Sequence, residues 1–577
     1  MHRLPLFRSH YNYHYSIVRR LHGGDVLYTT SAVTSAVPSA SSSSYIVVGN
    51  GPIGSSIAKH LVQLLASANN NNKTTPKVTI IDGKGVGVGS SHADKARLIR
   101  TFDAEGDEEW TTWNIRSLQS FPAIEKMWHK SSLLEESTNK NKSFFTQCGA
   151  LLMGDEEFVR RSKNAADKAT MMLSSSSLSS SSAAAAGKLP PTTTNKTSSS
   201  STSTVATPIR MSPIECQQKW PFLKPKVGCD MALFDSSGGI IDPNAFIEAQ
   251  NTITTAIAAA AGTNSRNVTT IDDDNDNNNK NYQEATTVPP NTVEFGIISD
   301  EVLKVGRNRV ELASSTRKIL CADTVIVCGG SYTKPLLKNS GYYCCEKKKN
   351  SSSSKWETIR SSKRIVALLE VSADFVQGIL KDMPSIKYAF DLDLDLNTNP
   401  NDEKMMPIPE RADAATPTAG EQSRVEAGSV YILPPVWYPG EREGEKGKWF
   451  IKIGGGDNKW IDTKNEIDDW LFNNNKSGND DDDDEDDDGN TTLSVSRLED
   501  IVRSLMPTIQ FDSVESMACV TTVDSNSSPQ SNGIVVDDDH IEDGIIAISA
   551  CQGKGAGPAE AISQDIAYKI YHNQINQ

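Results

Sequence analysis

The 577-residue sequence lacks several features that would assign it to a specialised class of protein. No run of about 18 apolar residues occurs, which excludes an ordinary membrane-spanning helix. Its nine cysteines include no CxxC pair and no repeated spacing, so we expect reduced thiols and neither a disulfide framework nor a zinc site. The net charge is -15 and no Lys/Arg-rich face with interleaved aromatic residues stands out, so nucleic acid is not an expected partner.

Acidic residues are also missing from the N-terminus, where Arg3, Arg8, Arg19 and Arg20 all precede the first acid, Asp25. A Ser/Ala-rich stretch follows and ends at Ser44. This composition is typical of a transit peptide, so we predict import into a mitochondrion or plastid. A disordered tail on a cytoplasmic protein is the alternative.

Much of the remaining chain is too polar and repetitive to form a core. Besides the N-terminal residues 1–44, we set aside as low-complexity insertions the ranges 163–208, 263–291, 339–361, 396–426 and 473–492. The last of these contains an unbroken acidic run from Asp480 to Asp488. Because long surface loops cost little entropy, such tracts are expected to interrupt a fold at its surface. The packable residues between them suffice for two or three domains.

Those packable segments begin and end with strand–helix patterns. Apolar runs and helical spacing predict a strand at 45–48, a helix at 52–66 and a strand at 77–81, with later strands at 324–328 and 544–550 and a helix at about 558–571. The stretches 293–298, 309–312, 430–433 and 449–453 are interpreted as antiparallel strands.

The predicted fold class is therefore α/β, or α+β overall, with two domains. We expect a Rossmann-like nucleotide-binding domain made of discontinuous segments, mainly 45–150, 210–262, 292–338 and 510–577. An antiparallel-sheet substrate domain is expected mainly from 151–162, 362–395 and 427–472.

A glycine-rich turn follows the first strand and opens the first helix. Its residues are Gly49, Asn50, Gly51, Pro52, Ile53 and Gly54. In a GxGxxG motif the first glycine allows a tight turn, the second lets the backbone approach a pyrophosphate, and the third lets the helix pack closely. Asp82 ends the next strand and can hold a ribose hydroxyl. Together these features predict a dinucleotide site.

A second glycine-rich loop lies between the last strand and the last helix. It contains Gly553, Lys554, Gly555 and Gly557, and its backbone N–H groups and the helix dipole can face an anion. Gly329, which follows the strand 324–328, is a further cofactor-binding candidate.

The segment after Asp82 resembles amine-oxidising flavoproteins of the D-amino-acid oxidase superfamily, in particular the sarcosine oxidase and pipecolate oxidase group. The resemblance rests on a Gly-Ser-Ser-His loop and an Arg-x-x-Arg pair: Gly89, Ser90, Ser91, His92, Arg97 and Arg100. It resumes at the blocks Phe234–Phe246, Ala322–Leu337, Phe450–Gly456, Cys519–Asp524 and Cys551–Ala567, in that order.

The resemblance implies that the cofactor is FAD, with Ser90, Ser91 and His92 among its contacts. The two arginines are expected on one helical face, Arg97 near the flavin and Arg100 on the substrate carboxylate. Lys452 matches a lysine that helps to activate oxygen, and Cys519 matches a cysteine that can carry the flavin covalently. The C-terminal glycine loop would then stabilise the reduced ring.

The implied reaction is oxidation of the C–N bond of a carboxylate-bearing amine or amino acid by hydride transfer to flavin N5, with O2 reduced to hydrogen peroxide. Two departures from the family pattern make sarcosine itself a doubtful substrate. Gly456 stands where a substrate-contacting histidine is usual, and the family's second carboxylate-binding cation falls at about Gly557.

Three alternatives remain open at this stage. An electron-transferring FAD dehydrogenase would use another electron acceptor in place of O2. A mitochondrial flavoprotein could act as an assembly or scaffold factor without amine turnover. An NAD-dependent dehydrogenase is disfavoured, because a plain NAD fold does not need the C-terminal glycine loop.

Overall fold

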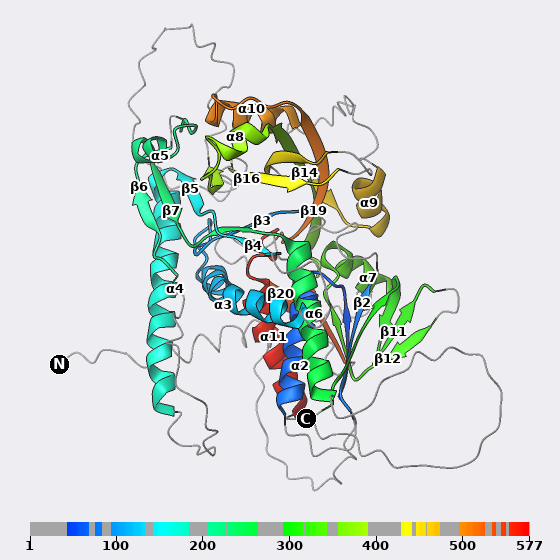
Figure 1. Cartoon of the computed structure of the whole chain (residues 1–577). Helices are drawn as coiled ribbons and strands as arrows, with labels where there is room; N and C mark the ends of the chain where they lie inside the picture. The colour runs from blue at the N-terminus through cyan, green and yellow to red at the C-terminus, as the bar shows by residue number, and fades with distance from the viewer. Residues whose placement is uncertain are drawn as a thin grey trace, which may run out of the picture.

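Two large sheets, one above the other in Figure 1, organise the computed structural model of the protein. The residues that it describes are 43–68, 75–83, 94–132, 142–183, 205–226, 229–262, 292–314, 318–342, 356–389, 429–440, 446–456, 459–473, 495–525, 534–537, 544–549 and 553–575. The predicted transit peptide, the acidic run, most of the predicted insertions, and Ser90, Ser91 and His92 lie outside these residues.

The lower sheet has six strands in the order β20-β21-β13-β1-β2-β9. Their bounds are β1 (Ser44–Val48), β2 (Lys77–Asp82), β9 (Glu294–Ser299), β13 (Thr324–Val327), β20 (Val535–Asp537) and β21 (Ile545–Ser549). All neighbours pair in parallel except β20 and β21. The sheet confirms the predicted strand–helix–strand opening and the late strands.

Both faces of this sheet are covered, which explains why its strands are apolar throughout. The helices α2 (Pro52–Ser67), α6 (Pro243–Gly262) and α11 (Ala559–Ile575) lie on one face, where Tyr45 and Val47 pack with them. The other face carries the small sheet β10 (Val302–Gly306), β11 (Arg309–Leu312) and β12 (Ile319–Cys321). Ile46 and Val48 pack on that side.

The prediction of an antiparallel strand at 293–298 was wrong. This segment forms β9, which pairs in parallel with β2 from Lys77–Glu294 to Asp82–Ser299. The physical reason is the helix before it, because α6 packs against α2 and returns the chain to the same end of the sheet. A strand that follows such a helical crossover must run parallel to its neighbour. The strands β11, β16 and β17 are antiparallel as predicted.

The upper sheet has nine strands in the order β18-β14-β17-β16-β15-β5-β7-β6, with β19 paired to β14. They are β5 (Ala150–Gly154), β6 (Ile209–Met211), β7 (Met231–Asp235), β14 (Ile359–Val371), β15 (Ser385–Ala389), β16 (Ser429–Tyr438), β17 (Lys448–Gly455), β18 (Lys459–Ile461) and β19 (Val514–Asp524). All neighbours are antiparallel except β5 and β15.

Alternation along these strands gives the upper sheet two different faces. Ile386, Ile432 and Ile451 point to one face and form a core with the amphipathic helix α10 (Val495–Leu505). Lys387 and Lys452 belong to the alternate set of residues and therefore point to the opposite face, which contacts the segment 94–107. This second face is where the two domains meet.

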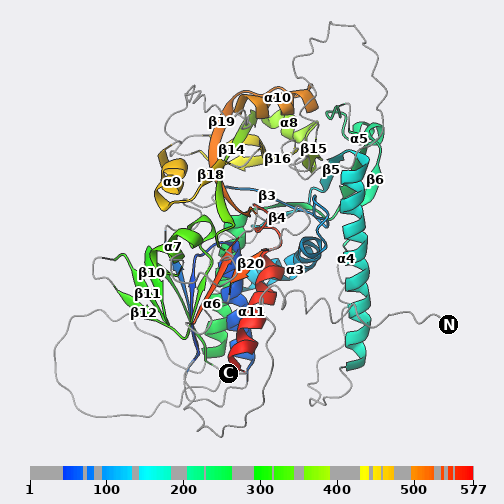
Figure 2. The same cartoon turned by 180° about the vertical axis from the view of Figure 1, so that it is seen from behind.

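A small sheet and two long helices complete the connection between the domains. The sheet contains β3 (Arg97–Ile99), β8 (Gly239–Ile241) and β4 (Phe145–Thr146), in the order β3-β8-β4. The helix α3 (Glu108–Ser132) packs against α4 (Glu156–Ala183), which lies at the edge of the molecule in Figures 1 and 2. Shorter helices are α5 (Pro213–Lys219), α7 (Thr333–Asn339), α8 (Ala373–Gln377) and α9 (Lys464–Asp468).

Two boundaries differ from those read in the sequence. The range 163–208 was expected to be an insertion, but α4 continues to Ala183 because Ala165, Ala166 and Ala169 bury one side of it. The strands β6, β7 and β19 join the upper sheet, whereas we had assigned their ranges mainly to the nucleotide-binding domain. Strand pairing between distant segments decides this membership.

Candidate functional site

The glycine-rich turn after β1 has the geometry that its sequence predicts. Gly49 has a φ of +106°, and a side chain there would come within 2.6 Å of the Cys328 carbonyl oxygen. A side chain on Gly54 would overlap the Gly49 carbonyl oxygen. Gly51 precedes α2, whose first residue is Pro52, and Ile53 packs into the lower core. The turn and the free N–H groups of the helix N-terminus therefore fit a pyrophosphate.

Asp82 lies beside this turn at the end of β2. The side-chain amide of Asn50 donates a hydrogen bond of 3.4 Å to Asp82, and Asn251 on α6 donates one of 3.2 Å to Asn50. Gly329 lies at the end of β13 and borders Gly49. The carboxyl ends of three parallel strands thus meet at one edge, where dinucleotides bind in such sheets.

The C-terminal glycine loop runs between the two domains. A side chain on Gly553 would meet Thr521 of β19 at 3.1 Å, and one on Gly557 would meet Ile99 of β3 at 3.1 Å. Gly555 is buried between them, and α11 begins directly after the loop. This close packing explains the repeated glycines and places the loop's backbone between β3 and β19. It also explains why no cation stands at Gly557.

The prediction that Arg97 and Arg100 share a helical face was wrong. Arg97 begins strand β3 and pairs with Ile241 of β8, and Arg100 directly follows the strand. Two arginines separated by two residues fit the spacing of a helix. Here, however, pairing with β8 makes the segment a strand. Alternation along an extended chain then sends the two side chains to different surroundings.

Arg97 and Lys452 meet at Asp94, a carboxylate that the sequence did not single out. Asp94 accepts a 2.8 Å hydrogen bond from Arg97 and also binds Lys452 and the Tyr438 hydroxyl. Burial alone would raise the pKa of Asp94, but Lys452 and Arg97 hold it well below its usual range. The segment therefore carries a buried, ionised carboxylate.

Lys452 lies deeper than we expected. It is 0% exposed, and its ammonium also donates to the Ala96 carbonyl at 3.2 Å. Burial and then Arg97 lower the pKa of Lys452 to about 8, although Asp94 opposes this shift. The lysine is thus desolvated as predicted, but its charge is compensated by an aspartate.

Cys519 lies on β19 opposite Arg364, at the part of the strand that borders the glycine loop. Its side chain is partly exposed and packs beside Val366, Leu368 and Phe450. Its carbonyl accepts a 2.9 Å hydrogen bond from the Trp470 indole. Covalent attachment of a flavin through this cysteine stays a prediction.

Arg100 has a buried side-chain nitrogen without a hydrogen-bond partner among the described residues. The side chain is only 8% exposed, and its Nε donates a 3.0 Å hydrogen bond to the Phe102 carbonyl. Its buried Nη1 has no hydrogen-bond partner within the described part of the chain. A buried guanidinium without a partner for one nitrogen is costly, so the geometry fits an anion bound at this position.

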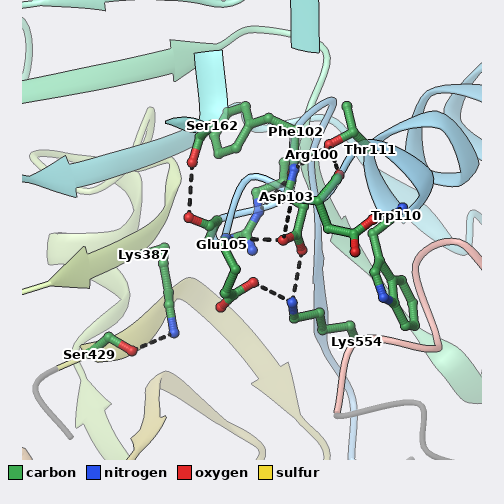
Figure 3. Close-up of polar contacts among 12 residues, drawn as sticks. Arg100, Phe102, Asp103, Glu105, Trp110, Thr111, Ser162, Lys387, Ser429 and Lys554 are labelled. Atoms are coloured by element: carbon green, nitrogen blue, oxygen red, sulfur yellow. Dashed lines mark hydrogen bonds and ion pairs between the residues drawn. The ribbon is translucent and has the colours of Figure 1, made fainter. Parts of the chain in front are cut away.

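Lys554 does not offer a free ammonium to a ligand. It donates a 2.9 Å hydrogen bond to Asp103 and pairs with Glu105, two acids that precede α3 (Figure 3). Burial and Glu105 raise the pKa of Asp103 to about 6, whereas Lys554 lowers the pKa of Glu105 despite its burial. No pattern in the sequence indicates this cluster, because Lys554 lies 451 positions from Asp103 in the chain.

A further buried ion pair joins α2, which follows the cofactor turn, to α11, which follows the glycine loop. Lys59 on α2 pairs with Glu560 on α11, and Gln250 on α6 donates a 3.0 Å hydrogen bond to the same carboxylate. Burial alone would raise the pKa of Glu560, but Lys59 and His60 lower it to about 2.

Replacing Glu560 with glutamine should therefore destabilise the protein by about 3–5 kcal/mol, since Lys59 would be left buried without a counter-charge. The free energy of unfolding measured in urea checks this at neutral pH. Glu560 has a lowered pKa, so its contribution is complete above the unfolded value of 4.5 and is lost as the pH falls toward 2.

The matched control is Glu294→Gln, because Glu294 forms a pair of 3.5 Å with Lys77 in which both side chains are more than half exposed. That substitution should change stability by less than about 1 kcal/mol. Equal effects of the two substitutions would contradict the role of the buried pair.

Comparison with known proteins agrees with this geometry. Residues 44–345, more than half of the chain, match the family described as DAO, FAD dependent oxidoreductase. The chain therefore belongs to this family of FAD-dependent oxidoreductases, and its cofactor is FAD. No curated protein matches the sequence. No helix in the described ranges combines the length and the apolar character needed to cross a bilayer.

Several solved structures have a similar fold. NikD, an unusual amino acid oxidase essential for nikkomycin biosynthesis, gives a TM-score of 0.49 at 13% identity in a variant form, covering 91% of this chain and 94% of NikD. Glycine oxidase from Bacillus cereus gives 0.46 at 11% identity, covering 92% and 95%. L-proline dehydrogenase from P. horikoshii gives 0.45 at 12% identity, covering 92% and 94%.

Proposed function

We propose that this oxidoreductase oxidises the C–N bond of an amine or amino acid that bears a carboxylate. The observation that carries the proposal is Arg100, a buried guanidinium whose Nη1 has no hydrogen-bond partner among the described residues, in the same cluster as Lys554 of the glycine loop (Figure 3). A planar guanidinium binds a carboxylate through two parallel hydrogen bonds. Family membership supports the redox chemistry, and Arg100 supports the carboxylate.

Bound FAD supplies the acceptor for the two electrons and the hydrogen that leave the substrate carbon. The substrate carbon loses a hydride and the substrate nitrogen loses a proton, which leaves an imine. Water then hydrolyses the imine to a carbonyl compound and to ammonia or an amine. Arg100 holds the carboxylate and thereby orients the C–H bond that breaks. The backbone N–H groups of the glycine loop would then stabilise the negative charge of the reduced cofactor.

Whether O2 or another compound accepts the electrons depends on the charge that Lys452 presents to the cofactor. As the proposed oxidase residue, its desolvated ammonium would stabilise the anion formed when O2 is reduced to hydrogen peroxide. Asp94 neutralises part of that charge. This single contact favours the second candidate, an electron-transferring dehydrogenase that reacts slowly with O2.

The purified protein is expected to lose its visible flavin absorption when a carboxylate-bearing secondary or primary amine is added without oxygen. An amine with the same carbon skeleton but an amide in place of the carboxylate should reduce the flavin much more slowly, because Arg100 has no charge to bind. Anaerobic spectrophotometry with such matched pairs measures this directly.

Admitting air afterwards separates the two candidate functions. Rapid return of the absorption with peroxide formation supports the oxidase, and slow return that a quinone or dye accelerates supports the dehydrogenase. Stable flavin absorption with every amine tested would contradict the proposal and favour a non-catalytic scaffold flavoprotein.

A further inference from the structure

The charges around Arg100 do not cancel. The cluster in Figure 3 contains Arg100, Lys387 and Lys554 as cations and Asp103 and Glu105 as anions. Lys554 binds both acids directly, at 2.9 Å in the case of Asp103. Neither Arg100 nor Lys387 forms an ion pair with these acids in the described part of the chain, and the five side chains together carry one more positive than negative charge.

The other buried carboxylates of this region are already committed to the backbone. Asp107 accepts the N–H groups of Glu109 and Trp110 and so caps α3. Asp235 accepts the N–H group of Thr101 at 2.7 Å. These backbone donors occupy the two carboxylates, and neither carboxylate accepts a hydrogen bond from Arg100 in the described part of the chain.

Lys387 approaches this cluster from the upper sheet. It lies on β15 between the core residues Ile386 and Tyr388, so its side chain points to the face that meets the other domain. Its ammonium donates a 2.9 Å hydrogen bond to the Ser429 hydroxyl, a neutral acceptor. Burial of the ammonium lowers the pKa of Lys387 to about 8, an effect that Glu105 opposes and that Arg100 and Lys554 reinforce.

A lysine with this lowered pKa gains most from an added anion, because both desolvation and two neighbouring cations disfavour its charge. Figure 3 shows the side chain of Lys387 and the guanidinium of Arg100 in one cluster beside Glu105, and the Nη1 of Arg100 has no hydrogen-bond partner among the described residues. One anion between the two cations would satisfy the guanidinium and stabilise the ammonium at the same time.

We propose that Lys387 is a specificity-determining residue that, together with Arg100, holds one carboxylate of the ligand. The inference rests on the proposed function, since it assigns the partner of Arg100 at the same site. Because three cations face two acids, the cluster has room for a single negative charge. The site should therefore favour monocarboxylates, and Glu105 should repel a second carboxylate on the same ligand.

Titration calorimetry of the FAD-loaded protein with benzoate tests this without turnover. Replacing Lys387 with methionine should raise the Kd for benzoate about tenfold or more, the usual effect of losing a hydrogen bond to a charged group. Lys387→Arg keeps the charge and should stay within about threefold of the unmodified protein. Benzene-1,3-dicarboxylate should bind the unmodified protein more weakly than benzoate does.

Lys381→Met is the matched control, because it makes the same chemical change at an exposed lysine six positions earlier in the chain. Visible flavin absorption shows in each variant that the fold and the cofactor are retained. Should Lys387→Arg also lose flavin, the benzoate–dicarboxylate comparison on the unmodified protein still decides.

The outcomes separate this inference from the proposed function. If benzoate binds and Lys387→Met leaves its Kd within about twofold, Lys387 is not part of the site and the inference fails while the proposed function stands. Equal or tighter binding of the dicarboxylate also overturns the inference. If benzoate does not bind the unmodified protein at all, the carboxylate site itself is contradicted, and the proposed function falls with it.

Discussion

Replacing Gly54 with valine is expected to abolish FAD binding. Even the first carbon of a side chain at this position would overlap the Gly49 carbonyl oxygen, and Val47 of β1 lies 3.4 Å away on the other side. The turn and α2 would have to separate, and the N–H groups that face the pyrophosphate would lose their alignment. Alanine should have the same effect to a smaller degree.

The ratio of visible flavin absorption to protein absorption in the purified variant measures this loss. Gly296→Ala is the control, since Gly296 lies on β9 of the same sheet and a side chain there would meet nothing within 4 Å. Far-ultraviolet circular dichroism should show the fold of the Gly54 variant retained. Full flavin content in Gly54→Val would show that the cofactor does not lie on this turn.

Replacing Arg100 with methionine is the second change for which we expect a large effect. The variant keeps a long unbranched side chain at this position but loses the buried guanidinium, its contact with the Phe102 ring and its Nη1. We expect kcat/KM for a carboxylate-bearing amine to fall at least about a hundredfold, because charge-assisted bidentate hydrogen bonds are among the strongest in proteins.

Steady-state kinetics with a matched amino acid and its amide test that expectation. The amide should be oxidised poorly and equally by both proteins, since it never used the guanidinium charge. Arg160→Met is a suitable control, because Arg160 forms an exposed pair with Glu157 on α4. A variant at Arg100 that loses the amide reaction in equal proportion would point to a damaged fold and not to a lost carboxylate contact.

The predicted and the observed structures agree best where the backbone conformation of a few neighbouring residues determines the structure. Gly49 needs a positive φ, and Gly54 must lie against Gly49, five residues before it. Both requirements act over a few residues, so the motif identified the turn, the following helix and the end of β2 correctly. The same holds for the glycine loop that precedes α11.

The predicted and the observed structures differ where a segment packs against or pairs with a segment that is distant in the chain. The spacing of Arg97 and Arg100 suited a helix, yet pairing with β8 made the segment a strand. The direction of β9 depended on the crossover through α6, which the strand's own residues do not reveal. Helical spacing and strand alternation describe one segment at a time, and neither describes what the segment packs against.

By itself, the sequence determined the dinucleotide turn and the two-domain α/β character, because short glycine motifs and apolar periodicity carry that information locally. The family of FAD-dependent oxidoreductases was indicated by the resemblance of its ordered residue blocks to amine-oxidising flavoproteins. Only the tertiary structure decided which charges meet. Asp94 reaches Lys452 from 358 positions away, and Asp103 reaches Lys554 from 451. Electrostatic energy in a buried site depends on distances of a few ångströms between such groups, and those distances exist only after the sheets have paired and the domains have packed.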